Sequence, residues 1–159
     1  MPKFLFLFFL AFITTAFAQQ DDYTTYCNSR FAFCIKYPKS FGKGKESDNG
    51  DGAIFNSKDK KAEIRSYGSL ALEDFDKLEQ RFKLATEGIT VTYKTMKADW
   101  FVFSGTDNAG NIIYQKTVKK KIAYFGDAGT PVFQTVRIKY PAEQQKNYEG
   151  YCGVMAKSF

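Results

Sequence analysis

The stretch SDNGDG at 47–52 combines two aspartates, an asparagine and two glycines within six residues. Such a stretch can form a calcium loop, because Ca²⁺ prefers carboxylate and carbonyl oxygens. An EF-hand loop starting at Asp48 would need side-chain oxygens at its third and fifth positions, where Gly50 and Gly52 stand. Asn-Gly and Asp-Gly pairs also suit tight turns, since they tolerate positive φ. We therefore expect a turn that leads into a strand at 53–57, with a weak calcium site as the alternative.

The sequence contains no histidine, and this limits the chemistry open to the chain. Ser-His-Asp triads, Cys-His pairs and histidine-containing zinc sites are excluded. A hydrolase built on two carboxylates is the enzymatic alternative. Asp74 and Asp76 are two residues apart, however, so on a helix they would not face each other. We expect a non-enzymatic protein with no catalytic residues, no metal and no cofactor.

The three cysteines, Cys27, Cys34 and Cys152, allow three pairings. Closing the short loop between Cys27 and Cys34 would contribute about 2.5 kcal/mol in the chain-entropy model. A two-residue turn at 28–29 would set Cys27 opposite Arg30 and leave Cys34 about 13 Å further along the strand. The bridge therefore requires a wider turn. We predict a Cys27–Cys34 disulfide and a buried free thiol at Cys152.

Residues 1–18 have the three parts of a secretory signal peptide. Lys3 supplies the positive charge, an apolar segment spans 4–13, and AFA at 16–18 fits a cleavage site. Ten apolar residues are too few to cross a bilayer, which needs about 20. We therefore expect no transmembrane segment, and a single exported domain at 19–159 that is periplasmic or secreted.

Alternating apolar residues predict most of the elements that would position these groups. In FAFCIKYP the residues Phe31, Phe33, Ile35 and Tyr37 share one side, and Pro38 ends the strand. WFVFSGT at 100–106 is apolar on both sides, which is typical of a strand covered on two faces. Residues 19–26 are polar and predict a loose or edge segment. Further strands are predicted at 53–57, 62–69, 89–95 (with Ile89, Val91 and Tyr93 inward), 112–118, 122–125 and 132–141, with turns at 58–61, 107–111 and 126–131.

Two segments change to a helical period. In 72–88 the residues Phe75, Leu78, Phe82 and Ala85 lie on one face, and Gly88 suits a helix end. The second predicted helix spans 143–159, with a stripe of Tyr148, Tyr151, Cys152, Met155 and Phe159. Together these elements predict an α+β fold, with a mainly antiparallel sheet and helices packed on both faces.

This order of elements resembles the PsbP/DcrB-like α/β/α sandwich superfamily. The resemblance rests on the early strand FAFCIKYP, the motifs ITVTYK, WFVFSG and IIYQKT, and the final helix ending in KSF. It covers most of the mature chain. Members are mainly non-enzymatic: photosystem accessory subunits, GTPase-binding proteins, exported lipoproteins and secretion-system chaperones. The resemblance implies a binding or accessory module. This chain lacks a lipobox, and it lacks the histidines that some relatives use for metal.

We expect this module to act on a protein partner in the bacterial envelope. The alternative is an inhibitor or immunity protein that blocks a partner enzyme with a protruding loop. The formal net charge is +6, but the basic residues are 19 Lys and 4 Arg. Nucleic-acid readers favour Arg, so we expect no nucleic-acid partner.

Two surfaces are candidates for the partner. One is the polar loop with Asp48, Asn49 and Asp51, and the other is the basic stretch KTVKKK with Lys119, Lys120 and Lys121. The lysines would suit an acidic partner or an anionic surface. They would equally protect an exposed strand edge from unwanted pairing, and the position at a strand end favours this second role.

Overall fold

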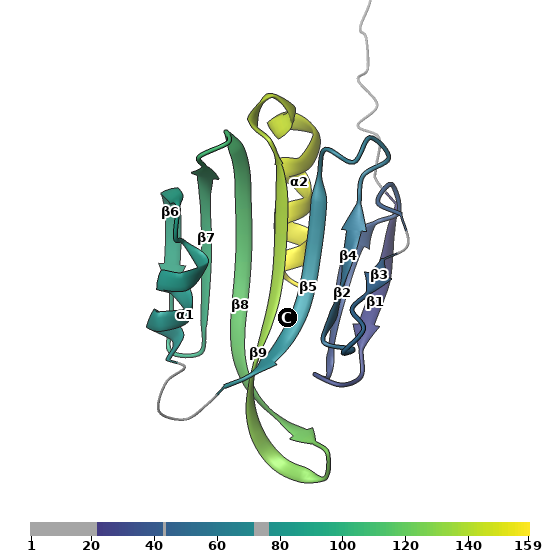
Figure 1. Ribbon diagram of the computed structural model, residues 1–159, viewed down its shortest axis with the longest axis vertical. Coiled ribbons are helices and arrows are strands. Elements are labelled where there is room, and N and C mark those ends of the chain that lie inside the picture. The colour runs from purple at the N-terminus through teal and green to yellow at the C-terminus, as the bar shows by residue number, and fades with distance from the viewer. Residues whose placement is uncertain (1–21, 43, 72–76) are drawn as a thin grey trace, which may run out of the picture.

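The computed structural model describes residues 22–42, 44–71 and 77–159 (Figure 1). The predicted signal peptide lies outside these residues, as do Phe75, Asp74 and Asp76 at the predicted start of the first helix. No helix in the described ranges is long and apolar enough to cross a membrane. The elements are β1 (Tyr23–Asn28), β2 (Phe33–Pro38), β3 (Lys45–Glu46), β4 (Gly52–Asn56), β5 (Glu63–Leu70), α1 (Leu78–Ala85), β6 (Ile89–Met96), β7 (Trp100–Asp107), β8 (Asn111–Tyr124), β9 (Asp127–Pro141), the 3₁₀ turn Ala142–Gln144 and α2 (Gln145–Ala156).

Seven strands form one antiparallel sheet in the order β3-β4-β5-β9-β8-β7-β6, and β1 and β2 form a separate hairpin. The centre of the sheet is the β8–β9 hairpin, whose strands are 14 and 15 residues long. Strand β7 accompanies β8 only as far as Val118, and β5 accompanies β9 only from Val132. The end of the hairpin, residues 119–131, therefore projects beyond its neighbours (Figure 1). We call these residues the arm.

The even-numbered residues of β9 point to one side of the sheet, which we call the dry face. Val132, Val136 and Ile138 are fully buried there. They pack against the β1–β2 hairpin, whose predicted alternation is confirmed, and against Tyr151 and Met155 of α2. Aromatic rings on elements far apart in sequence fill this cluster, so the hairpin and α2 are held mainly by hydrophobic burial.

The odd-numbered residues of β9 point to the opposite side, which we call the wet face. Phe133 joins an apolar cluster with Phe101, Phe103 and α1. The α1 residue Phe82 packs edge-on against both β7 rings, at centroid distances of 5.4 and 5.9 Å. Because α1 has only eight residues, the odd positions further along β9, from Thr135 to Lys139, stay polar.

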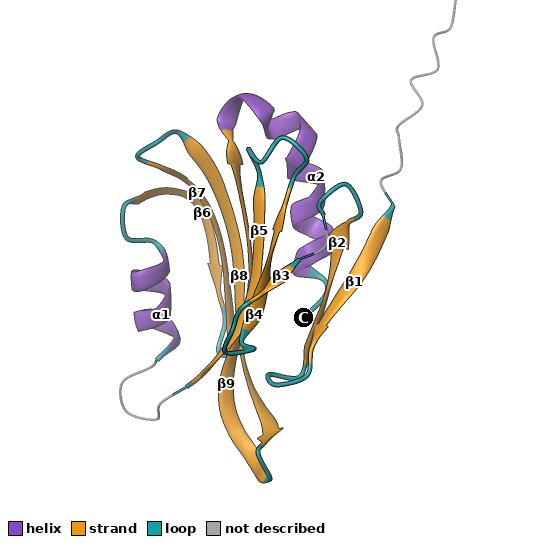
Figure 2. Ribbon diagram, turned by 45° about the vertical axis from the view of Figure 1, so that its right-hand side comes forward, coloured by secondary structure: helices purple, strands orange, loops and turns teal. Residues whose placement is uncertain are grey.

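The predicted α+β class and the mainly antiparallel sheet are confirmed. In Figure 2, α1 and α2 lie to the left and right of the long strands. The finer prediction of an α/β/α sandwich stays a prediction, because the β1–β2 hairpin shares the dry face with α2 and the short α1 lies against only part of the other side.

Two predicted boundaries are wrong. Residues 122–125 form no separate strand, since Ile122–Tyr124 continue β8. The predicted turn at 126–131 is mostly β9, and the chain turns at Phe125 and Gly126. Each of the lysines 119–121 pairs with a residue on β9. A strand tolerates these lysines because each long side chain keeps its charged end in water. Of the two alternatives predicted for 19–26, the edge segment is observed at 23–26, which belong to β1 in the two-stranded β1–β2 hairpin.

The orientation of the Tyr93 side chain also differs from its prediction. Alternation from Ile89 and Val91 predicts an inward ring, but Tyr93 is 54% exposed. Between Val91 and Tyr93 the register with β7 shifts by a β-bulge. An extra residue in one strand reverses which side the following side chains face. The bulge therefore moves Tyr93 off the face that Val91 occupies.

Candidate functional site

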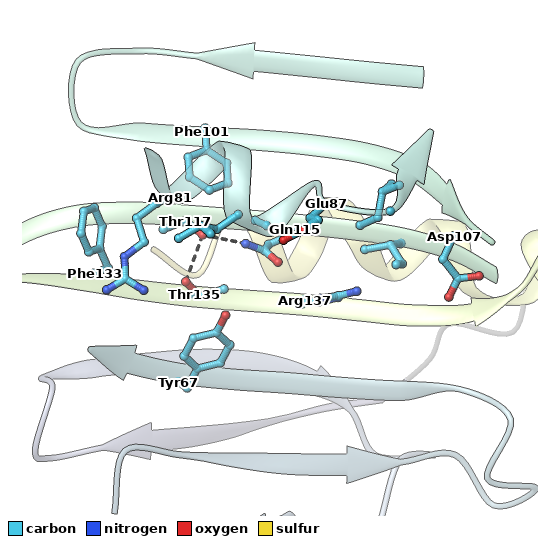
Figure 3. Close-up of a pocket in the computed structure, with 15 residues that line it drawn as sticks. Tyr67, Arg81, Glu87, Phe101, Asp107, Gln115, Thr117, Phe133, Thr135 and Arg137 are labelled. Atoms are coloured by element: carbon cyan, nitrogen blue, oxygen red, sulfur yellow. Dashed lines mark hydrogen bonds between the residues drawn. The ribbon is translucent and has the colours of Figure 1, made fainter. Parts of the chain in front are cut away.

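A cavity of about 350 Å³ opens on the wet face between α1 and the central strands (Figure 3). Its apolar wall is formed by Phe101, Ile113 and Phe133, which belong to the α1 cluster. Its polar floor consists of Gln115, Thr117 and Thr135, which are 3%, 2% and 3% exposed. We call this cavity the groove.

The polar floor follows directly from strand register. Thr117 of β8 lies opposite Thr135 of β9, and their hydroxyl oxygens are 3.0 Å apart. The Gln115 amide donates to Thr117 Oγ1 at 3.1 Å. These bonds satisfy the buried hydroxyls. None of the three side chains is bonded to a general base within the described residues, so the floor offers hydrogen bonds rather than an activated nucleophile.

Charged side chains extend the groove along the odd positions of β5 and β9. Arg65 binds Glu63 in an ion pair, and Lys139 binds Asp107 at 2.7 Å. The Lys139 ammonium holds the pKa of Asp107 well below its usual range. Burial lowers the pKa of the Arg137 guanidinium from its ordinary value. Unlike Arg65 and Lys139, Arg137 has no carboxylate partner among the described residues, because the two nearby carboxylates are already paired.

A second hollow, of about 610 Å³, adjoins the groove and shares Tyr67 and Arg137 with it. It runs along β4 toward the edge of the sheet, and its lining includes Asp48 and Asp51. The loop at 47–52 therefore lies at the rim of this hollow, a position that its sequence did not reveal.

The loop itself is a turn, as predicted. Gly50 has φ +67°, and a Cβ at Gly52 would lie 2.2 Å from the Ser66 carbonyl oxygen. Asp51 accepts hydrogen bonds from Ser47 Oγ at 2.6 Å and from the Asn49 amide at 3.0 Å. These contacts use the Asp51 carboxylate to shape the turn. The described residues contain no group of three or more acidic, Cys or His side chains placed to hold a metal.

The predicted lysines lie on the arm. Lys119 is partly buried with its ammonium 5.7 Å from the Phe133 ring, and Lys120 and Lys121 are exposed. Here β8 has β9 on one side and no described strand on the other, which is the setting where lysines protect an edge. Lys116, from the same stretch, instead donates to the Ala156 carbonyl at 2.6 Å and so ties β8 to α2.

Arg30 connects the loop at 47–52 to the arm, which no sequence pattern indicates. Its guanidinium donates to the Tyr124 hydroxyl at 3.0 and 2.8 Å and to the Asn49 carbonyl. The loop at 47–52 and the base of the arm tip are thus held together through one side chain. Asn28 adds a 2.9 Å bond to the Gly50 carbonyl. Only the tertiary structure brings these segments to the same end of the molecule.

Phe125 forms the tip of the arm and was also missed. It is 86% exposed and has φ +47°, a conformation that costs a bulky residue energy. Its ring touches only the neighbouring Tyr124 among described aromatic contacts, at a centroid distance of 4.7 Å. The sequence signal was present in YFGDAG, where an aromatic residue precedes a glycine at a turn.

The predicted Cys27–Cys34 disulfide is confirmed. The two residues are directly opposite in the β1–β2 ladder, because the connection at 29–32 is wider than a two-residue turn. Cys152 is free and half-buried, beside Tyr140. Burial raises the pKa of its thiol to about 11, so the reactive thiolate is disfavoured.

Comparison with known proteins identifies the fold. No protein-family model and no curated protein matches the sequence. The structure is similar to the solution structure of cyanobacterial PsbP (CyanoP) from Synechocystis sp. PCC 6803, with a TM-score of 0.58. The fold is PsbP-like. Sequence identity is 10%, over 91% of this chain and 95% of the cyanobacterial one, so the predicted resemblance is confirmed for the fold alone.

Proposed function

We propose that this chain is an exported, non-enzymatic accessory module that binds a protein partner in the bacterial envelope through its arm. The observation that carries the proposal is Phe125, a large apolar side chain that is 86% exposed at the tip of a projecting hairpin. Aromatic side chains that enter a partner's pocket supply much of the energy of protein interfaces. A strained, exposed aromatic residue is costly to the free protein, which favours a role in binding.

The charge of the arm favours an acidic partner surface. Lys119, Lys120 and Lys121 lie on β8 between the sheet and the tip, and Arg30 lies against Tyr124 at the base of the tip. Complementary charge speeds association and selects between partners. In this proposal the lysines serve two purposes: they protect the free edge of β8 in the unbound protein and contact the partner when it is bound.

The loop residues Asp48, Asn49 and Asp51 are proposed as a secondary contact. Arg30 donates hydrogen bonds to both the Asn49 carbonyl and the Tyr124 hydroxyl, so a partner that binds the arm would lie near this loop. The carboxylate of Asp51 shapes the turn, which leaves Asp48 as the more available charge.

The proposal also includes export from the cytoplasm and the arrangement of the layers. The Cys27–Cys34 disulfide is compatible with an oxidising compartment outside the cytoplasm. We also propose that the layers form an α/β/α sandwich, supported by the packing of α1 against the odd-numbered and of α2 against the even-numbered side of β9. The PsbP-like fold supports an accessory role by analogy.

The test begins with a photo-crosslinking residue in place of Phe125 in the exported protein. The crosslinked partner is purified, and its dissociation constant is measured with the Phe125→Ala variant. We expect affinity to fall at least about tenfold, as for an interface hot spot. The matched control is Tyr93→Ala, which removes an exposed aromatic ring from β6 and should leave affinity unchanged.

Replacing Lys119, Lys120 and Lys121 with Gln should also weaken binding and reduce its dependence on salt. Equal affinities for the Phe125 and Tyr93 variants would contradict the proposal. If the partner is an enzyme whose activity stops on binding, the protein is an inhibitor rather than an accessory module.

A further inference from the structure

The groove on the wet face contains an arginine without a bound acid. Arg137 is half-buried, and no hydrogen bond or ion pair joins its guanidinium to another side chain of the described residues. Two carboxylates, Glu63 and Asp107, interact electrostatically with Arg137. They are already paired with Arg65 and Lys139, respectively. A guanidinium keeps its charge when partly buried, so this one is available to an anion.

Two further polar groups lie beside Arg137. Tyr67 faces the groove opposite Thr135, and its hydroxyl has no hydrogen-bond partner among the described residues. Gln115 gives its amide to Thr117 and leaves its carbonyl oxygen free to accept. In Figure 3 the Tyr67 ring points toward Thr135, and Arg137 lies between Gln115 and Asp107. A guanidinium and a phenol hydroxyl on adjacent strands form a donor pair that suits a carboxylate.

The groove also has an apolar side. Phe101, Ile113 and Phe133 line the side toward α1, together with Leu84 and Ala85. A volume of about 350 Å³ is near the lower end of the range for small-ligand pockets. An anion that fills this space would carry its charge at one end and a short hydrocarbon group at the other.

We propose that the groove binds a small carboxylic acid with an aliphatic or aromatic tail. The carboxylate is held by the Arg137 guanidinium and the Tyr67 hydroxyl, and the tail packs against Phe101 and Ile113. Glu87 at the rim disfavours a second negative charge on the tail, so the ligand is a monoacid. This site is separate from the arm and does not depend on the proposed function.

The experiment is a nuclear magnetic resonance titration of the disulfide-bonded mature chain with hexanoate. Acetate and inorganic phosphate are the comparison ligands, because acetate lacks the tail and phosphate lacks both tail and planar carboxylate. Hexanoate should shift the signals of residues 67, 115 and 137, and should bind more tightly than either comparison ligand. Phosphate binding as tight as hexanoate, or no shift in the groove, would overturn the proposal.

Variants identify the groups that bind. Arg137→Gln should weaken hexanoate binding at least about tenfold, since a charged hydrogen-bond donor is lost. Arg137→Lys keeps the charge without the fork and should give an intermediate affinity. Tyr67→Phe should weaken binding several-fold. Lys97→Gln makes the same charge change at an exposed position outside the groove, and it should have no effect. Equal affinities for the Arg137→Gln and Lys97→Gln variants would refute the assignment.

The two proposals fail independently. Phe125→Ala should leave hexanoate binding unchanged, and Arg137→Gln should leave partner affinity unchanged. Loss of hexanoate binding in the Phe125 variant would show that the groove and the arm are one site, which would contradict their separation.

Discussion

The two faces of the central sheet use the same strands in opposite ways. Along β9, the even residues Val132, Val136 and Ile138 are fully buried under the β1–β2 hairpin and α2. Between them, Thr135 and Arg137 line an open groove on the other face. The short α1 covers only the apolar end of that face. The difference indicates that the dry face supplies stability, while the wet face and the arm are available for binding.

Polar content distinguishes the faces as well. The dry face does contain Gln134, but its amide donates to the Phe31 and Ala32 carbonyls at 2.8 and 3.2 Å and so anchors the hairpin. On the wet face, the Arg137 side chain has no such described partner. These two bonds satisfy the Gln134 amide nitrogen and stabilise the fold, whereas an unpaired charge at the rim of a cavity is available to a ligand.

The largest expected effect is on the dry face. Phe55 is 1% exposed, with ring centroids 4.2 Å from Tyr37 and 5.4 Å from Tyr26. Phe55→Ala should lower the free energy of unfolding by about 3–5 kcal/mol, because it removes buried surface and leaves a cavity. Urea denaturation measures this change. Arg137→Gln on the wet face should change stability by less than about 1 kcal/mol, and equal losses for the two variants would contradict the division of the faces.

The next effect concerns the hairpin that covers the dry face. Replacing Cys27 and Cys34 together with Ser should lower the free energy of unfolding by about 2.5 kcal/mol through the unfolded state. Thermal unfolding with and without reductant measures it. Reductant should destabilise the wild-type chain to the level of the double variant and leave that variant unchanged. A wild-type protein that is insensitive to reductant would show that packing alone holds the hairpin.

The turn at 47–52 separates backbone effects from metal binding. Gly50→Val should cost about 1–2 kcal/mol, because Gly50 has φ +67°. Replacing Asp48 and Asp51 together with Asn should change stability little, since Asn suits the same turn. Melting temperatures are measured for both with and without calcium. A calcium-dependent rise that disappears in the double Asn variant would replace the turn interpretation with a metal site.

The smallest expected effect is an ion pair on the wet face. Lys139 lowers the pKa of Asp107, so the folded state gains stability above the ordinary Asp pKa of about 3.9, and loses it as pH falls toward the lower folded value. Relative to Asp107→Asn, the wild type should be more stable by about 0.2–1 kcal/mol near neutral pH. The difference should vanish in acid. Urea denaturation from about pH 6 to about pH 2 tests this, and a difference that grows in acid would contradict it.

Most strands could be predicted because their apolar alternation survives in the structure. Phe31, Phe33, Ile35 and Tyr37 all lie buried on one side. Prediction failed where neighbours in space decide the geometry. A bulge against β7 turned Tyr93 outward. Pairing with β9 extended β8 through a run of lysines that has no alternating pattern.

The candidate sites divide in the same way. Local chemistry pointed to the loop at 47–52, the lysines 119–121 and the close cysteines, because turn propensity, charge and sequence spacing are visible in single segments. It did not indicate Phe125 as a tip, since exposure depends on how far β8 and β9 extend beyond β7 and β5. Nor did it indicate Arg30, whose partners Asn49 and Tyr124 come from distant segments.

The sequence by itself determined the period of each element, the short disulfide loop and the glycine turn, because these depend on neighbours within a few residues. The tertiary structure alone decided that Tyr67 and Arg137 line one groove. Their strands are adjacent only because β9 returns between β5 and β8. Strand order and register depend on the apolar surface that the whole sheet buries. No local pattern in the sequence indicates that total.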